Sequence, residues 1–174
     1  MSKNLVIIPT YNEKENIERI ILKVFSLEND FHILIVDDGS PDGTADIVKN
    51  LQKNYSKKLF IEKRSGKLGL GTAYIHGFRW ALQKKYEFIF EMDADFSHNP
   101  EDLLRLLNQC ENLGSDVAIG SRYVNGVNIV NWPMSRLLMS YFASKYVKMI
   151  TGMPIHDSTA GFKCYSRKVL ERIN

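Results

Sequence analysis

Short, unbroken apolar runs alternate along the chain with segments whose apolar residues recur every three or four positions. Five runs predict buried strands, at residues 5–8, 33–36, 59–61, 88–90 and 117–119. A sixth strand is expected over 161–165, and helical spacing predicts a long helix from about 134 to 150. This alternation indicates an α/β fold in which a mostly parallel central sheet carries helices on both faces.

Local chemistry predicts where two of the helices begin. Asn12 and Glu15 have the spacing of a capping box ahead of the first helix. Asn99 followed by Pro100 favours a second helix start, because proline fits the first helical turn. We interpret the neighbouring His98 as part of that helix start rather than as a metal ligand.

Length and composition fit one globular domain. The chain has 174 residues, and its net charge of +3 is too small for a protein that neutralises nucleic acid phosphates. Two cysteines, Cys110 and Cys164, are too few for a disulfide framework and fit a reducing compartment. No signal peptide is evident, and every apolar run is far shorter than the roughly 20 residues that cross a bilayer. We therefore expect any contact with a membrane to be made from its surface.

Carboxylates follow the ends of three predicted strands. Glu13 follows the first strand, Asp37 and Asp38 the second, and Asp93 and Asp95 the fourth. Each acid alone could be a helix cap or a loop residue. Ligands of parallel sheets bind beyond the carboxyl ends of the strands, so five acids gathered there would repel one another and have raised pKa values. A divalent cation such as Mg²⁺ would relieve that repulsion, and the Asp-x-Asp pair is its best candidate site.

The glycine-rich connection at residues 65–71 fits neither familiar phosphate-binding motif. Tyr74 stands where a dinucleotide fingerprint needs its third glycine, and Lys67 is followed by leucine instead of serine or threonine. Two interpretations stay open. The glycines could let the next helix approach the sheet closely, or Arg64 and Lys67 could reach a nucleotide phosphate.

Two arginines and a serine late in the chain could bind an anion. Arg122 follows the fifth strand, and Arg136 and Ser140 lie four residues apart on one face of the long helix. The segment 132–153 is rich in apolar residues with interspersed basic ones. Such a segment is either a core-facing helix or a helix that lies in a membrane interface.

Six short motifs follow one another along the chain: PTYNE at 9–13, VDDGSPDGT at 36–44, GLGTA at 69–73, DADFSH at 93–98, GSRY at 120–123 and GFK at 161–163. In this order they resemble the motifs of the family 2 glycosyltransferases, and specifically those of their dolichol-phosphate (polyprenol-phosphate) mannosyltransferase branch. The resemblance implies a GT-A fold. It also implies an inverting, metal-dependent transfer of a hexose, mannose from GDP-mannose above all, onto a polyprenyl phosphate.

The resemblance also implies roles for individual residues. The nucleotide-sugar site would comprise Pro9, Tyr11, Glu13, Val36, Asp38, Lys67, Asp93, Ala94, Asp95 and Arg122. Asp93 and Asp95 would hold Mg²⁺ or Mn²⁺, with Ser97 a weak further candidate because some relatives have a glutamine ligand there. The residues expected to take part in catalysis are Asp95, Arg122, Arg136 and Ser140, the last two by receiving the lipid phosphate.

Relatives of that branch continue with an acceptor loop beyond the end of this sequence. We therefore expect residues 1–174 to be a single catalytic domain that is truncated at its C-terminal end. We expect it to be cytoplasmic and peripheral at the membrane face, where it could work with a membrane-anchoring partner.

Three alternatives stay open. The chain could be a fragment that binds a nucleotide sugar without turnover, or a related transferase that uses a UDP-sugar. Residues 88–97 also approximate the Asp-x-Asp motif of haloacid-dehalogenase-like phosphatases, with Asp93 as nucleophile. Those enzymes usually carry the motif on their first strand, which is not its place here.

Overall fold

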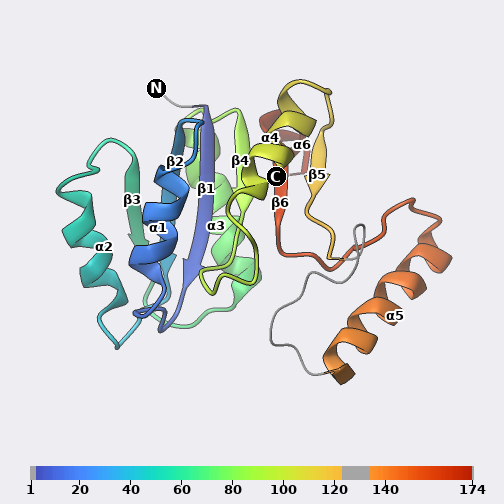
Figure 1. The fold of residues 1–174 in the computed structure, drawn as a ribbon, viewed down its shortest axis with the longest axis horizontal. Helices are drawn as coiled ribbons and strands as arrows, with labels where there is room; N and C mark the ends of the chain where they lie inside the picture. The colour runs from blue at the N-terminus through green and yellow to red at the C-terminus, as the bar shows by residue number, and fades with distance from the viewer. Residues whose placement is uncertain (1–2, 123–133, 174) are drawn as a thin grey trace.

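The computed structural model describes residues 3–122 and 134–173, apart from the side chains of Arg136 and Leu137. Its described strands form one six-stranded sheet in the order β3-β2-β1-β4-β6-β5 (Figure 1). The strands are β1 (Asn4–Thr10), β2 (Phe31–Asp37), β3 (Leu59–Lys63), β4 (Phe88–Glu91), β5 (Val117–Ile119) and β6 (Lys163–Ser166). The first four are parallel, whereas β6 is antiparallel to both of its neighbours. The predicted α/β fold with a mostly parallel sheet is confirmed.

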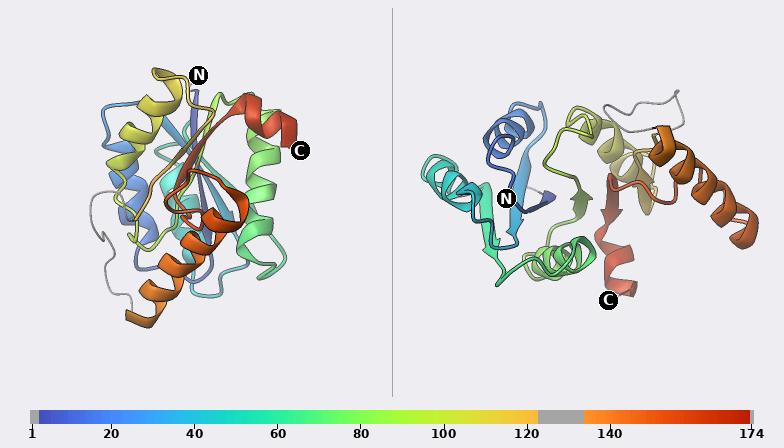
Figure 2. Two further views of the ribbon diagram at one scale, coloured as in Figure 1. Left: turned by 90° about the vertical axis from the view of Figure 1, so that its right-hand side faces the viewer. Right: turned by 90° about the horizontal axis from the view of Figure 1, so that it is seen from below.

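Helices cover both faces of this sheet. The described helices are α1 (Ile17–Phe25), α2 (Thr44–Gln52), α3 (Leu70–Gln83), α4 (Asp102–Glu111), α5 (Met134–Thr151) and α6 (Arg167–Ile173). Helices α1, α2 and α4 pack on one face, and α3 and α6 pack on the other (Figure 2). Helix α5 projects away from the sheet beside β5 and β6 (Figure 1).

The apolar runs are continuous because both faces of the central strands are buried. On β1, Val6 and Ile8 pack with the α1 side of the core, whereas Leu5 and Ile7 pack with the α3 side. Successive side chains of a strand point to opposite faces, so a strand covered on both sides needs apolar residues at every position.

The first helix begins later than the capping-box spacing predicts. Helix α1 starts at Ile17, and its N-cap Asn16 makes no side-chain capping bond. Asn12 instead adopts a left-handed backbone with φ of 62°. The backbone N–H groups of Asn16 and Ile17 both donate to the carbonyl of Glu13, which closes a turn ahead of the helix. The predicted capping box is therefore wrong.

The second predicted helix start agrees more closely. Helix α4 begins at Asp102, and the side chain of Asn99 accepts a hydrogen bond of 3.1 Å from the backbone of Glu101. Asn99 thus satisfies one N–H ahead of the helix, as residues of its type do at helix starts.

Close packing of α3 on the sheet depends on one glycine within the helix. A Cβ atom on Gly77 would lie 2.7 Å from Cγ2 of Ile7, which is too close for any real contact. Gly69, the N-cap of α3, and Gly71 in its first turn have no neighbour within 4 Å of such an atom. The glycine that lets the helix approach the sheet is therefore Gly77, and not those of the predicted glycine-rich connection.

Candidate active site

The carboxyl ends of β1, β2 and β4 meet at the lower edge of the sheet in Figure 1. Pro9 on β1 is paired in register with Val36 on β2, and Thr10 is paired with Asp37. The residues expected to hold a nucleoside are thereby brought together from two neighbouring strands. On the other side of β1, the last residue of β4, Glu91, is paired with Ile7, three residues before β1 ends.

The two aspartates that end β2 have different surroundings. Asp37 is fully buried and accepts hydrogen bonds from the hydroxyls of Thr10 at 3.0 Å and of Ser40 at 2.6 Å. It therefore fixes the turn after β2. Asp38 lies next to it and receives an arginine, as described below.

Arg64 binds Asp38 through a bidentate ion pair. Its Nε lies 2.6 Å from Oδ1 of Asp38 and its Nη2 lies 2.7 Å from Oδ2, and both side chains are only 8% exposed. The same guanidinium donates to the hydroxyl of Thr72 and to the carbonyl of Gly69. Arg64 thus ties the glycine-rich connection to the end of β2. The hypothesis that Arg64 reaches a phosphate is not supported by this placement.

Lys67 lies on the same connection and reaches the first strand end. Its Nζ is 4.7 Å from the centre of the Tyr11 ring, and both residues are exposed. The structure therefore places Lys67 beside a residue that the resemblance assigns to the nucleoside.

Three aspartates from two segments act on Glu13 at this edge. Glu13 is half-buried, and its pKa is raised above the usual value first by burial and then by the charges of Asp95, Asp42 and Asp93, against a lowering hydrogen bond from Asn16. Such mutual repulsion is what a bound cation would relieve. Of the five acids predicted to converge, Asp37 is hydrogen-bonded by two hydroxyls and Asp38 is paired with Arg64, whereas the charges of Asp93 and Asp95 act on Glu13.

The Asp-x-Asp segment follows β4 in the predicted turn. The half-buried Asp93 accepts a hydrogen bond of 3.1 Å from the hydroxyl of Tyr74, whereas Asp95 is exposed and accepts one of 2.9 Å from the backbone of Ser97. Ala94 between them is buried. Within residues 3–122 and 134–173, no three His, Cys, Asp or Glu side chains are arranged to hold a metal ion by themselves. Two carboxylates still suit Mg²⁺, which often takes its other ligands from phosphate and water.

Arg122 is held by an aspartate from the other side of the site. Its Nε donates to Oδ2 of Asp157 at 2.8 Å and its Nη2 donates to Oδ1 at 2.7 Å, while its backbone N–H also donates to Oδ2. Asp157 is completely buried. Burial would raise the pKa of Asp157, but the hydrogen bonds and charge of Arg122 bring it below its usual value.

Ser140 reaches this pair from α5. Its hydroxyl lies 3.3 Å from that of Thr159, which in turn accepts a hydrogen bond of 2.6 Å from Nη2 of Arg122. Arg136 lies one turn earlier on the same helix, and its side chain is outside the described part of the structure.

His98 lies inside the site instead of serving only to start a helix. Its ring stacks on Phe162 with 4.9 Å between the ring centres, and its Nδ1 is buried without a hydrogen-bond partner in the described part of the chain. Burial lowers its pKa, against the opposing charges of Asp93 and Asp95. The charges of Arg122 and Asp157 also affect this pKa. His98 therefore lies close to both the Asp-x-Asp segment and the pair of Arg122 with Asp157.

Sequence reasoning missed four contributors to this site, namely Tyr74, Asp157, Thr159 and the pairing of Arg64 with Asp38. The signal for Asp157 and Thr159 was their position just before the last predicted strand. Asp157 is 35 residues from Arg122 along the chain, so no local spacing connects the two.

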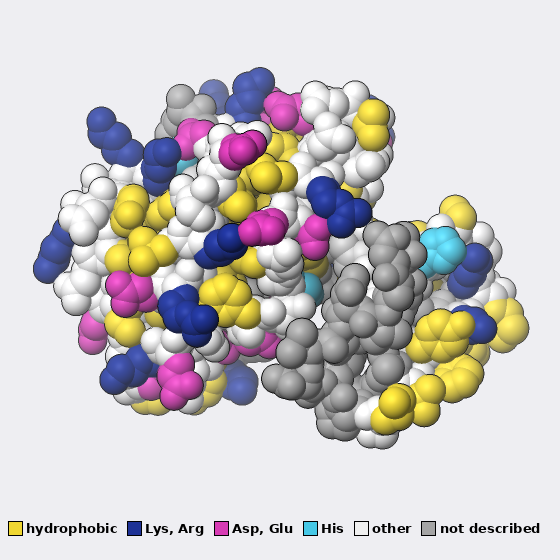
Figure 3. Space-filling model, in the orientation of Figure 1, with side chains coloured by type: hydrophobic (Ala, Val, Ile, Leu, Met, Phe, Trp, Pro, Cys, Tyr) yellow, Lys and Arg dark blue, Asp and Glu magenta, His cyan; other side chains and the backbone are white. Residues whose placement is uncertain are grey.

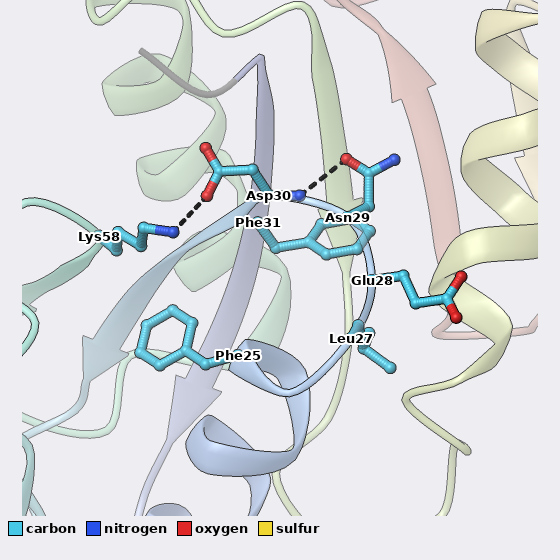
Figure 4. A pocket seen from close by; sticks show the side chains of 7 residues that line it. All are labelled: Phe25, Leu27, Glu28, Asn29, Asp30, Phe31 and Lys58. Carbon is cyan, nitrogen blue, oxygen red and sulfur yellow. Dashed lines mark hydrogen bonds and ion pairs between the residues drawn. The ribbon is translucent and has the colours of Figure 1, made fainter.

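One hollow lies at the opposite edge of the sheet, where β2 begins. It has a volume of about 210 Å³, and Figure 4 shows the side chains that line it. Two of its polar side chains pair with each other, since Lys58 binds Asp30 at 2.5 Å. The ends of β1, β2 and β4 lie away from it, so it is separate from the candidate site.

No helix in the described ranges is long and apolar enough to cross a bilayer. The longest of them is α5, with 18 residues.

The sequence of the chain matches a family of known proteins. Residues 5–173 match the model of the family described as glycosyl transferase family 2. The chain is 48% identical over 172 residues to the polyprenol monophosphomannose synthase of Mycolicibacterium smegmatis, covering 99% of this chain and 64% of that protein. It is 41% identical over 170 residues to the undecaprenyl-phosphate mannosyltransferase of Micrococcus luteus, covering 98% and 69%. The chain thus spans about two thirds of the length of these relatives.

Solved structures share the fold at lower identity. One is a mannosyltransferase from Pyrobaculum calidifontis in complex with GDP-mannose and Mn²⁺, with a TM-score of 0.68, 20% identity, and coverage of 99% of this chain and 46% of that one. Another is TarS residues 1–349 of S. aureus in complex with UDP-GlcNAc, with a TM-score of 0.66, 23% identity, and coverage of 99% and 47%. These likenesses confirm the predicted GT-A fold. With the family match over nearly its whole length, the chain belongs to glycosyltransferase family 2.

Proposed function

We propose that this chain transfers mannose from GDP-mannose to a polyprenyl phosphate with inversion at the sugar. The observation that carries the proposal is that two aspartates and an arginine lie around one side chain at the strand ends. The charges of Asp93, Asp95 and Arg122 all affect the pKa of His98. An acidic half suits a metal-bound diphosphate, and an arginine suits an anionic group beside it. The identity to two polyprenyl-phosphate mannosyltransferases supports the choice of sugar and acceptor.

The donor nucleoside would bind where β1 and β2 end. Pro9, Tyr11 and Glu13 would line this region from the first strand, and Val36 and Asp38 from the second. The pair with Arg64 fixes the direction of the Asp38 carboxylate, so that its remaining acceptor capacity is oriented before the ligand arrives. Lys67 lies above Tyr11 and would contact the ligand from the glycine-rich connection.

A divalent cation fits the acidic half of the site. Asp93, Asp95 and more weakly Ser97 would hold Mg²⁺ or Mn²⁺ together with the donor diphosphate, and Ala94 would pack against it. The raised pKa of Glu13 supports this assignment, because the charges of Asp95 and Asp93 add to the effect of burial there. When bound, the metal would neutralise charge on the departing diphosphate.

The site must orient the acceptor phosphate but does not need to remove a proton from it. A phosphate monoester has its second pKa near 6, so it is already anionic around neutral pH and a strong general base is unnecessary. Arg122 would contact donor phosphate or sugar, and Arg136 with Ser140 would receive the lipid phosphate. An acceptor oxygen would form the bond to the anomeric carbon as the bond to the diphosphate breaks, and GDP would leave with that electron pair.

Helix α5 would bring the site to a membrane surface. Among its described side chains only Ser144 is buried, and large apolar ones are exposed, with Phe142, Tyr146 and Met149 each at least 61% exposed (Figure 3). The helix has no acidic residue and carries Lys145 and Lys148 beside these apolar groups. Basic and apolar side chains on one exposed helix match an anionic lipid surface, where a lipid-linked acceptor would be found.

Two alternatives remain to be distinguished by experiment, since the family excludes a haloacid-dehalogenase-like phosphatase. Titration calorimetry with Mn²⁺ should show binding of GDP-mannose and much weaker binding of UDP-glucose. Tighter binding of UDP-glucose would instead favour a transferase that uses a UDP-sugar. Donor binding without transfer to a short polyprenyl phosphate would indicate a binding protein without turnover.

A further inference from the structure

The hydroxyl of Thr159 lies at the junction of the donor and acceptor halves of the site. It accepts a hydrogen bond of 2.6 Å from Nη2 of Arg122 and donates one of 3.3 Å to Oδ1 of Asp157. It also lies 3.3 Å from the hydroxyl of Ser140 on α5. Three segments that are far apart in the sequence therefore meet at one oxygen atom.

The direction of these bonds follows from the chemistry of a hydroxyl group. A hydroxyl has one proton to donate and two lone pairs that accept. The proton of Thr159 is directed to Asp157, so its lone pairs receive Arg122 and Ser140. When Thr159 donates to Asp157, Ser140 is the donor in its contact with Thr159.

We propose that Thr159 is a positioning residue that couples donor binding to acceptor binding. The inference rests on the proposed function, in which Arg122 contacts the donor and Ser140 the lipid phosphate. To bind a phosphate oxygen, Ser140 must turn its proton away from Thr159. This frees a lone pair on Thr159, which strengthens its hydrogen bond with Arg122. The bond then holds the Arg122 guanidinium more firmly where it contacts the donor, so that acceptor binding favours donor binding.

Such coupling is measurable as a change in donor affinity. A single hydrogen bond contributes enough free energy to change a binding constant by about 2- to 10-fold. We expect a short polyprenyl phosphate to tighten the binding of a GDP-mannose analogue, in which CH₂ replaces the anomeric oxygen so that no transfer occurs, by a factor in this range, as measured with Mn²⁺ by calorimetry on the full chain. By reciprocity, the analogue should tighten acceptor binding by the same factor.

Variants at this position separate coupling from folding. In Thr159→Val the change in donor affinity should disappear, and Thr159→Ser should restore it because the hydroxyl returns. Ser158→Ala is the matched control, because the Ser158 hydroxyl is buried without a partner in the described part of the chain. Melting temperatures of all three variants show whether each one folds.

The outcomes distinguish this inference from the proposed function. If the wild-type chain fails to bind GDP-mannose or polyprenyl phosphate, the proposed function itself fails. If both ligands bind but neither affects the other, or if Thr159→Val retains the wild-type coupling, the role of Thr159 is overturned. Loss of coupling in Thr159→Val with recovery in Thr159→Ser supports it.

Discussion

At the scale of single residues, the buried pair between Arg64 and Asp38 holds the end of β2. Both side chains are 8% exposed, and two short hydrogen bonds connect them. Removing one partner of a buried pair leaves the other charged in a poorly solvated place, which costs about 3–5 kcal/mol. An exposed ion pair is worth about 0–1 kcal/mol.

We therefore expect Arg64→Ala to lower the free energy of unfolding by about 3 kcal/mol in urea titrations. Arg105→Ala is the matched control, because Arg105 pairs with Asp102 at the surface with its own side chain 73% exposed. That variant should lose at most about 1 kcal/mol. Equal losses in the two variants would contradict the role given to the Arg64 pair.

Asp157 gives a prediction for pH. Its pKa in the folded protein lies below the ordinary 3.8 because the hydrogen bonds and charge of Arg122 outweigh burial. A carboxyl with a depressed folded pKa stabilises the protein above its unfolded pKa, and this stabilisation is lost as the pH falls through the folded pKa.

The amide in Asp157→Asn cannot titrate in this way. The wild type should therefore exceed Asp157→Asn in unfolding free energy near neutral pH, and the difference should shrink as the pH falls from about 5 to about 2. Urea titrations at several pH values measure it. A difference that stays constant over this window would show that the charge of Asp157 does not stabilise the fold.

At the scale of elements, the distance between α3 and the sheet depends on Gly77. Alanine favours a helix over glycine by about 1 kcal/mol, whereas overpacking a core costs about 1–3 kcal/mol. A Cβ at this position would collide with the fully buried Ile7, so overpacking should win. We expect Gly77→Ala to destabilise the protein by about 1 kcal/mol or more.

Gly71→Ala is the control for this change, because it lies in the same helix and its new Cβ would have no neighbour within 4 Å. It should be neutral or slightly stabilising in thermal unfolding. Adding Ile7→Val to Gly77→Ala should recover part of the loss. If the two alanine variants were equally stable, the contact of Gly77 with β1 would not limit the packing.

The apolar face of α5 gives the second prediction at this scale. Phe142 and Met149 are 61% and 74% exposed, so replacing both by serine should leave the melting temperature unchanged. Burying each of these side chains in a membrane interface would contribute roughly 1.5–3 kcal/mol to the free energy of binding. The double variant should therefore bind anionic vesicles at least about tenfold more weakly in sedimentation assays.

Leu113→Ser controls for lost surface hydrophobicity, because Leu113 is 64% exposed after α4 and away from α5. It should bind vesicles as the wild type does. If the double α5 variant and Leu113→Ser bound equally well, α5 would not be the element that meets the lipid.

At the scale of the whole molecule, the strands and the helices that follow them could be predicted because each is a local pattern of burial. The clustering of Glu13 with Asp93 and Asp95 also followed, since parallel strands end at one edge. The antiparallel direction of β6 could not be predicted, because the apolar pattern of a four-residue strand is the same in a parallel and an antiparallel pairing.

Ion pairs between residues far apart in the sequence could not be predicted either. Arg64 binds Asp38 from 26 residues away, and this depends on β3 lying beside β2 in the observed register. The capping box failed for a related reason. Asn12 has a suitable side chain, but its backbone N–H donates to Ser40 on the next strand's loop, so contacts between loops set the turn ahead of α1.

The central claim is that this site transfers mannose with the help of the Asp-x-Asp segment. The most direct test measures transfer of labelled mannose from GDP-mannose to a short polyprenyl phosphate in the presence of Mn²⁺. Asp95→Ala is compared with Asp46→Ala, which removes an exposed aspartate from the first turn of α2. We predict transfer by the wild type and Asp46→Ala, and a loss of about a hundredfold or more in a folded Asp95→Ala. Transfer by Asp95→Ala at the wild-type rate would contradict the claim.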